Sequence, residues 1–239
     1  MSSVEEQFLI QLCLGETILP FRILNPRLIV IPIIDVDTGE VIDSHIARDR
    51  GLSGLAGWLE QAERTWDHHK SSNMSLYERI NYNGELSVQF PRTDFRMVYP
   101  TSGTNLCGAA LKDKSVVVDT SAYWISCTYL EAKFLSAVFN APFFLEQVSK
   151  YQSVGLMGTR HFHKHPFRIP IPKFNRTNNL HLQLVDAATR AESMAEAVDL
   201  SGISNSTQAR RAIRHQLATN GMFTELDRLV AHLLESLDL

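Results

Sequence analysis

Cationic side chains gather in one part of this 239-residue chain, where no acidic side chain accompanies them. No Asp or Glu occurs from Gln147 to Val185, although the chain as a whole has a net charge of −3. An excess of Lys and Arg of this kind suits contact with phosphate groups, and the alternative is an ordinary solvated face. We interpret this cationic segment (residues 147–185) as a phosphate-facing surface. Its basic side chains are Lys150, Arg160, Lys164, Arg168, Lys173 and Arg176, with His161, His163, His165 and His181.

Three of these histidines alternate along the chain, at positions 161, 163 and 165. On a β-strand all three could face one side and bind zinc or nickel. The neighbouring Arg160 and Lys164 would repel a cation, and no carboxylate lies nearby in the sequence to orient the imidazoles. The pattern therefore favours no metal site.

A second constellation could do chemistry: Asp119, followed by Glu131 and Lys133. An Asp followed by Glu-x-Lys can build the Mg²⁺ site of a nuclease. In such a site the Glu and Lys lie on a strand, whereas here the apolar spacing through Phe139 predicts a helix, on which positions i and i+2 point about 200° apart. We expect solvated helix surface and keep a Mg-dependent nuclease as the alternative function.

A polar stretch, residues 67–83, offers side chains that could read DNA bases. It has few apolar positions, so we expect an exposed loop. Arg, Lys and Asn side chains on such loops can reach base edges in the major groove. Each of these side chains could equally be an ordinary hydrated loop residue, and Arg79 could have a structural role in packing. The base-reading candidates are His68, His69, Lys70, Asn73, Arg79, Asn81 and Asn83.

The elements that must position these side chains change in character along the chain. Apolar spacing predicts short strands mixed with helices up to about residue 175, then helices alone. We therefore expect an α+β fold with small mixed sheets and packed helices, divided into a domain at 1–178 and a helical C-terminal region at 179–239. The expected strands lie within 21–41, with a turn at 37–39, and at 96–99, 115–119 and 123–127. The expected helices lie at 52–66, 130–139, 142–148, 180–198, 207–219 and 224–237, with Asn140 as an N-cap and the last helices packing or docking on a partner.

Composition excludes several classes of protein. The cysteines form no C-x-x-C pair, which argues against a disulfide framework and a zinc knuckle and favours a reducing compartment. The longest apolar run, Leu28–Ile34, is far shorter than the ~20 residues of a membrane-spanning helix. Residues 1–15 have Glu5 and Glu6 where a signal peptide has basic residues. We expect a cytoplasmic protein with no membrane partner.

Familiar catalytic motifs are also missing. Gly51, Gly54 and Gly57 begin a helical pattern with no preceding strand, so they match neither a P-loop nor a dinucleotide fingerprint. None of the nine prolines has a proline neighbour, so the chain lacks the Asx-Pro-Pro-aromatic loop of amino-directed DNA methyltransferases. The chain is therefore expected to have no catalytic site of its own.

The stretch from Gly158 to Phe174 reads GTRHFHKHPFRIPIPKF. It resembles the R-x-F-x-K-x-x-F-x-x-P-I-P-x-F pattern in the TaqI-type target-recognition (specificity) domain of adenine-N6 DNA methyltransferases of type II restriction-modification systems. Further similar motifs follow in the same order over about residues 6 to 200, including Leu14-Gly15-Glu16, Trp58-Leu59 and Phe139-Asn140. The three alternating histidines depart from the family, in which acidic residues or tyrosine are common there.

This resemblance implies a division of labour. A separate catalytic domain or subunit would bind S-adenosylmethionine, while this chain would bind double-stranded DNA and supply sequence specificity, with no cofactor of its own. Prolines 170 and 172 would brace the cationic segment. A helical docking subunit is a further alternative. The expected phosphate contacts are Lys150, Arg160, His161, Lys164, Arg168 and Lys173.

Overall fold

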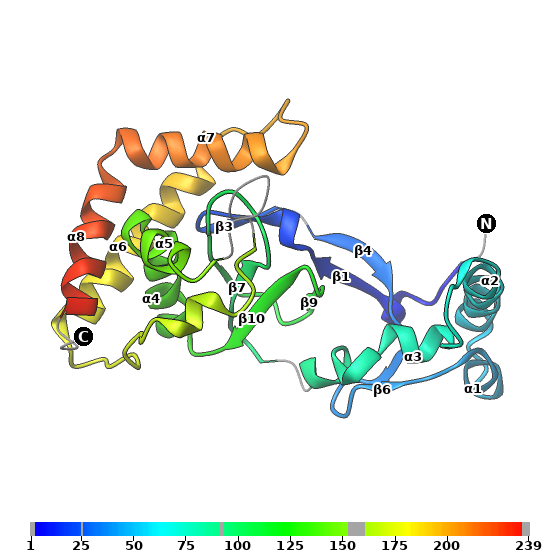
Figure 1. The fold of residues 1–239 in the computed structure, drawn as a ribbon. Coiled ribbons are helices and arrows are strands. Elements are labelled where there is room, and N and C mark those ends of the chain that lie inside the picture. The colour runs from blue at the N-terminus through cyan, green and yellow to red at the C-terminus, as the bar shows by residue number, and fades with distance from the viewer. Residues whose placement is uncertain (1–2, 25, 91–92, 153–160, 236–239) are drawn as a thin grey trace. The chain divides into compact units, whose positions relative to one another are not determined.

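The computed structural model describes residues 3–24, 26–90, 93–152 and 161–235, which form two compact units (Figure 1). Unit 1 comprises residues 1–12, 27–93 and 114–117, and unit 2 comprises residues 13–26, 94–113 and 118–239. The predicted mixed α+β class, with small sheets followed by an all-helical C-terminal region, is confirmed. Within the described residues, no helix is both long and apolar enough to cross a membrane.

Unit 1 combines a three-stranded sheet, in the order β4-β1-β9, and the β5–β6 pair with helices α1, α2 and α3. Its β5–β6 pair is the predicted hairpin, with Ile33 opposite Val41 and Gly39 at φ +70° in the turn. A positive φ suits glycine, which explains the Asp37-Thr38-Gly39 sequence. The elements are β1 (Leu9–Cys13, which ends in unit 2), β4 (Arg27–Val30), β5 (Ile33–Asp35), β6 (Glu40–Val41), α1 (Ser44–Asp49), α2 (Ser53–His69), α3 (Leu76–Ile80) and β9 (Val117–Val118, shared with unit 2). Short 3₁₀ helices cover Glu6–Phe8, Tyr82–Gly84 and Ser87–Gln89.

The expected exposed loop at 67–83 is largely helical, so that prediction is wrong. Helix α2 continues to His69, and α3 begins at a reciprocal capping box between Ser75 and Glu78. The phenol of Tyr77 contacts Glu63 of α2 and accepts a hydrogen bond from the N–H of Ser44. These contacts between α1, α2 and α3 stabilise helix in a sequence whose polar composition by itself suggested a loop.

Unit 2 builds a three-stranded antiparallel sheet, in the order β10-β7-β8, and covers it with helices. The sequence pattern predicts strands at two of these positions. It misses the third, Ala109–Leu111, because Ala-Ala-Leu has no β-branched residue. The elements are β2 (Ile18–Leu19), β3 (Arg22–Ile23), β7 (Arg96–Pro100), β8 (Ala109–Leu111), β10 (Ala122–Ser126), α4 (Tyr129–Asn140), α5 (Pro142–Ser149), α6 (Asn179–Glu196), α7 (Ser206–Thr219) and α8 (Met222–Glu235), with 3₁₀ helices at Gly15–Thr17 and His165–Arg168.

Helix α4 packs on the sheet at Gly108, where a Cβ would lie 3.0 Å from the Cβ of Phe139. Asn140 was expected to cap α5, but the buried Asn140 amide instead bonds both backbone groups of Gly108 and the carbonyl of Ser136. The N-cap of α5 is Ala141, which makes no side-chain hydrogen bond. These hydrogen bonds therefore join the end of α4 to the residue that directly precedes β8.

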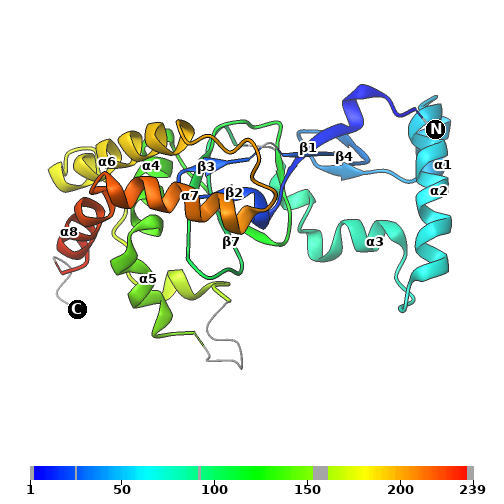
Figure 2. The ribbon, with the colours of Figure 1, turned by 90° about the horizontal axis from the view of Figure 1, so that it is seen from above.

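Helices on both sides of residue 178 share one hydrophobic core. Helix α6 lies against α4, and α8 contacts both α5 and α6 (Figure 2). The apolar face of α8, including Leu226, Leu229 and Leu233, is buried in that core together with Phe134 and Phe144. The compact units therefore do not follow the expected boundary at 178, because α6 covers a surface that α4 leaves apolar.

Candidate nucleic-acid interface

The described part of the cationic segment is tied to the end of β7. Phe162 is buried, and its N–H donates to the carbonyl of Thr101 at 2.8 Å. The N–H of His163 donates to the same oxygen, and the Tyr99 hydroxyl donates to the His163 carbonyl at 2.8 Å. The backbone is thus fixed while the side chains at 161, 163 and 164 are exposed. Arg160 lies outside the described residues.

The cations of this segment have no carboxylate partner among the residues that the structure describes. Lys150, Lys164 and Lys173 are exposed, and Lys150 Nζ donates to Gln147 Oε1 at 2.6 Å. Arg168 is exposed as well, with its guanidinium 5.6 Å from the ring centre of Tyr151. An exposed cation without a carboxylate partner is available to bind an anionic ligand.

The extended stretch after the 3₁₀ helix is anchored by apolar side chains. Ile169 is buried, and the ring of Phe174 packs 5.6 Å from that of Phe134. His181 is a structural histidine: its Nδ1 accepts from the N–H of Asn175 at 3.0 Å, and burial lowers its pKa. His181 therefore adds no charge to the surface, unlike the exposed basic residues before it.

The alternating histidines do not lie together on one face of a strand. His161 and His163 stack with ring centres 5.3 Å apart, His163 has φ +39°, and His165 begins the 3₁₀ helix. No group of three metal-ligating side chains occurs in the described parts of the chain. The strand geometry that would align three imidazoles is absent from this stretch, apart from an isolated bridge between Ser102 and His161.

The base-reading candidates all lie in unit 1. Four of them are exposed, and their side chains form no hydrogen bond or ion pair with another described residue. His68 and His69 occupy the last turn of α2, with ring centres 4.7 Å apart in an edge-to-face contact. Asn73 lies in the turn before α3, and Arg79 is on the exposed face of α3. These positions are accessible to a ligand.

The other three candidates differ in the contacts that their side chains make. Lys70 Nζ is 2.7 Å from Asp67 Oδ1. The Asn81 amide donates to Ser87 Oγ and accepts from the N–H groups of Leu86 and Ser87, so it shapes the following turn. Asn83 is exposed at φ +53°, a conformation that Asn tolerates better than most residues.

The residues of the alternative nuclease site each have a structural partner. Asp119 Oδ1 accepts from the Ser121 N–H at 2.8 Å, and Glu131 forms a capping box with Thr128 at the start of α4. Lys133 was expected on solvated helix surface, but its side chain is only 3% exposed and it pairs with Glu192 of α6. The expectation of a solvated surface is therefore wrong for Lys133, because the packing of α6 on α4 buries its side chain.

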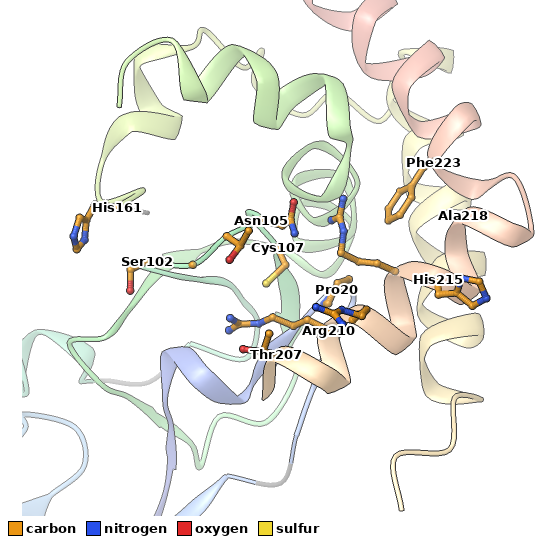
Figure 3. Close-up of a pocket in the computed structure, with 14 residues that line it drawn as sticks. Pro20, Ser102, Asn105, Cys107, His161, Thr207, Arg210, His215, Ala218 and Phe223 are labelled. Atoms are coloured by element: carbon orange, nitrogen blue, oxygen red, sulfur yellow. The ribbon is translucent and has the colours of Figure 1, made fainter. Parts of the chain in front are cut away.

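A further basic cluster was not recognised from the sequence. Arg210, Arg211, Arg214 and His215 of α7 line a cavity of about 770 Å³ in unit 2, and His161 of the cationic segment lines it too (Figure 3). A signal was present, because no acidic residue occurs between Asp199 and Glu225. The i, i+4 spacing of 210 with 214, and of 211 with 215, places these basic residues on one helix face.

No protein-family model matches the chain, and a search of curated proteins finds no match either. The function is therefore inferred from the residues and their geometry.

Proposed function

We propose that this chain is a DNA target-recognition module that binds double-stranded DNA and works with a separate methyltransferase catalytic domain or subunit. In this proposal the partner binds S-adenosylmethionine, and the present chain supplies sequence specificity without a catalytic site. The observation that carries the proposal is the set of exposed cations without carboxylate partners in the described chain. They lie on a segment whose backbone is hydrogen-bonded to Thr101, directly after β7.

Phosphate binding is assigned to unit 2. Lys164 and Arg168 flank the ends of a short 3₁₀ helix whose backbone is held by Phe162 and Pro166, both buried. Fixed anchoring lowers the entropy lost when a side chain contacts a phosphate, and Arg can bind phosphate in a bidentate manner. Such contacts position a duplex without reading its sequence.

Base reading is assigned to unit 1, with a smaller set of residues than its sequence offers. His68, His69, Asn73 and Arg79 are exposed and form no ion pair with a described residue, whereas Asn81 is used in the fold. Side chains of these types can hydrogen-bond to base edges.

The phosphate assignment is tested by the salt dependence of binding to a duplex of random sequence. Lys164→Ala and Arg168→Ala should each reduce the slope of log K against log salt by about 0.9, because each removes one phosphate contact. Arg228→Ala, which removes an exposed cation of α8, is the matched control and should leave the slope unchanged. Equal slopes for the parent chain and these three variants would refute the assignment.

The reading assignment is tested by selecting duplexes from a randomised pool. Asn73→Ala or Arg79→Ala should remove the preference at one base position, at a cost of ~1 to 3 kcal/mol, with non-specific affinity nearly unchanged. Selection of the same sequence by both variants and the parent chain would exclude these side chains from reading.

The division of labour has its own test. The purified chain is expected neither to bind S-adenosylmethionine nor to methylate plasmid DNA. Methylation by this chain without an added subunit would contradict the proposal.

A further inference from the structure

The cavity in unit 2 has the size of a small-molecule site. Its volume of about 770 Å³ falls within the ~300–1,000 Å³ typical of ligand pockets. Three parts of unit 2 form much of its wall: helix α7, the 102–107 loop and His161. In Figure 3, His161 and Phe223 lie at opposite sides of the cavity, with Asn105 and Cys107 between them.

The wall of this cavity is strongly basic. Arg210, Arg211 and Arg214 line it with His161 and His215, and none of its described lining residues is an Asp or Glu. Since unit 2 contains nearly as many acidic as basic residues, the exclusion of carboxylates from this wall is a local property. A wall with several guanidinium groups and no carboxylate attracts anions.

Arg210 is held in place by the backbone. Its Nε donates to the Ile18 carbonyl at 2.9 Å and its Nη2 to the Gly15 carbonyl at 2.6 Å. Gly103 of the 102–107 loop lies beside this guanidinium, since a Cβ at Gly103 would be in ordinary contact with Arg210 Nη1, at 3.5 Å. Arg210 therefore contributes a fixed positive charge to the cavity.

Arg211 and Arg214 differ from Arg210 because the side chain of neither forms a hydrogen bond or an ion pair with another described residue. The Arg214 guanidinium lies 4.7 Å from the ring centre of Phe223, and burial lowers its pKa. Asp227 attracts this charge from outside the cavity wall, with its Oδ1 accepting a hydrogen bond from the Phe143 N–H. A partly buried cation that forms no ion pair is costly, and a bound anion would offset that cost.

The rest of the wall suits the remainder of a nucleotide. The hydroxyls of Ser102 and Thr207 and the amide of Asn105 can hydrogen-bond to a sugar or base, while Pro20 and Phe223 offer apolar contact. Aromatic rings and guanidinium planes accept the flat face of any base. The volume exceeds what an inorganic phosphate needs.

We propose that this cavity binds a nucleoside phosphate, with the phosphate held by Arg211 and Arg214 and the base beside Phe223. The ligand is either a free mononucleotide or the 5′-phosphorylated end of a nucleic-acid strand. This site goes beyond DNA target recognition, because neither form of ligand requires the duplex-binding surface at Lys164 and Arg168.

The test is calorimetric titration of the full chain with the four deoxynucleoside monophosphates, the matching deoxynucleosides and inorganic phosphate. A monophosphate should bind at least about tenfold more tightly than its deoxynucleoside. Arg211→Gln and Arg214→Gln should each weaken its binding by about tenfold, equivalent to about 1.4 kcal/mol. Arg228→Gln, on α8 and outside the cavity wall, is the matched control and should bind like the parent chain. Because Arg211 is exposed, its variant should keep the parent melting temperature.

A second arm separates the two sources of the phosphate. Short single strands with and without a 5′-phosphate are titrated into the same proteins. Tighter binding of the phosphorylated strand, lost in Arg211→Gln while free mononucleotides stay unbound, assigns the site to a strand end. The proposal is overturned if no phosphate-bearing probe binds, or if Arg211→Gln and Arg214→Gln bind every probe as the parent does. Duplex salt slopes of the Lys164→Ala protein are independent of both results, so the two proposals can fail separately.

Discussion

The two units of this protein differ in how their cations are grouped. Unit 1 has eight Lys and Arg against twelve Asp and Glu, and unit 2 has fifteen against fourteen. In unit 1, Arg48, Arg50 and Lys70 each pair with a carboxylate of the same unit. Unit 2 also contains paired cations, such as Lys133 and Arg190, but its cationic segment and α7 present Lys and Arg side chains without such partners in the described chain. The surroundings of a cation, and not its residue type, thus decide whether it is available to a ligand.

The hydrophobic cores of the two units also differ, in the size of their clusters. Two small clusters occur in the described part of unit 1, one around Leu55 and Leu59 and the other around Ile10 and Ile33. Unit 2 contains a larger cluster, which extends from the sheet through α4 to α8. A large, close-packed core can anchor exposed segments rigidly, which suits unit 2 to hold a charged ligand.

Substitutions in the two cores should cause the greatest loss of stability and test whether the cores are independent. Phe139 of unit 2 and Leu59 of unit 1 are fully buried. Phe139→Ala should lower the free energy of unfolding by about 4 kcal/mol and Leu59→Ala by about 3 kcal/mol, through lost burial and the cavity left behind. Hydrogen exchange should show the loss mainly in amides of the substituted unit. Equal loss of protection in both units after either substitution would show that the cores are not independent.

A medium effect on stability is expected for a buried ion pair, and a much smaller one for an exposed pair. Glu192→Gln leaves Lys133, which is 3% exposed, without its carboxylate and should cost about 3 kcal/mol of unfolding free energy. Asp67→Asn removes the partner of Lys70, a pair with side chains 28% and 63% exposed, and should cost under about 0.5 kcal/mol. Denaturant titration measures both changes. Similar losses of unfolding free energy for the two variants would show that burial does not determine how much each ion pair contributes to stability.

A smaller effect tests the difference in charge between the units. Lys173 of unit 2 and Arg64 of unit 1 are both exposed. Lys173→Ala should reduce the salt slope of non-specific duplex binding by about 0.9, whereas Arg64→Ala should leave it unchanged. Fluorescence anisotropy over a salt series measures both slopes. A reduced slope for the Arg64 variant would place phosphate contacts in unit 1 as well.

Local patterns in the sequence predicted much of the fold. The helices from 180 onwards follow apolar stripes, and α7 closes at Asn220-Gly221 with Gly221 at φ +72°. The β5–β6 turn follows from Gly39 in the same way. Such features depend on residues within a few positions of one another, so they can be predicted from the local sequence. The acid-free stretch at 147–185 is likewise a property of the sequence alone.

Other features depend on partners far away in the chain, and tertiary packing fixed them. Lys133 is buried because α6 brings Glu192 over α4, and Asn140 bonds Gly108 across 32 positions. The arginines of α7 form a cavity wall because the 102–107 loop and His161 fold against that helix. The order of residues sets which side chains carry charge and which helix face they occupy. Packing between distant segments sets which of those charges are neutralised and which are left for a ligand, because pairing requires a carboxylate within a few ångströms in space and not along the chain.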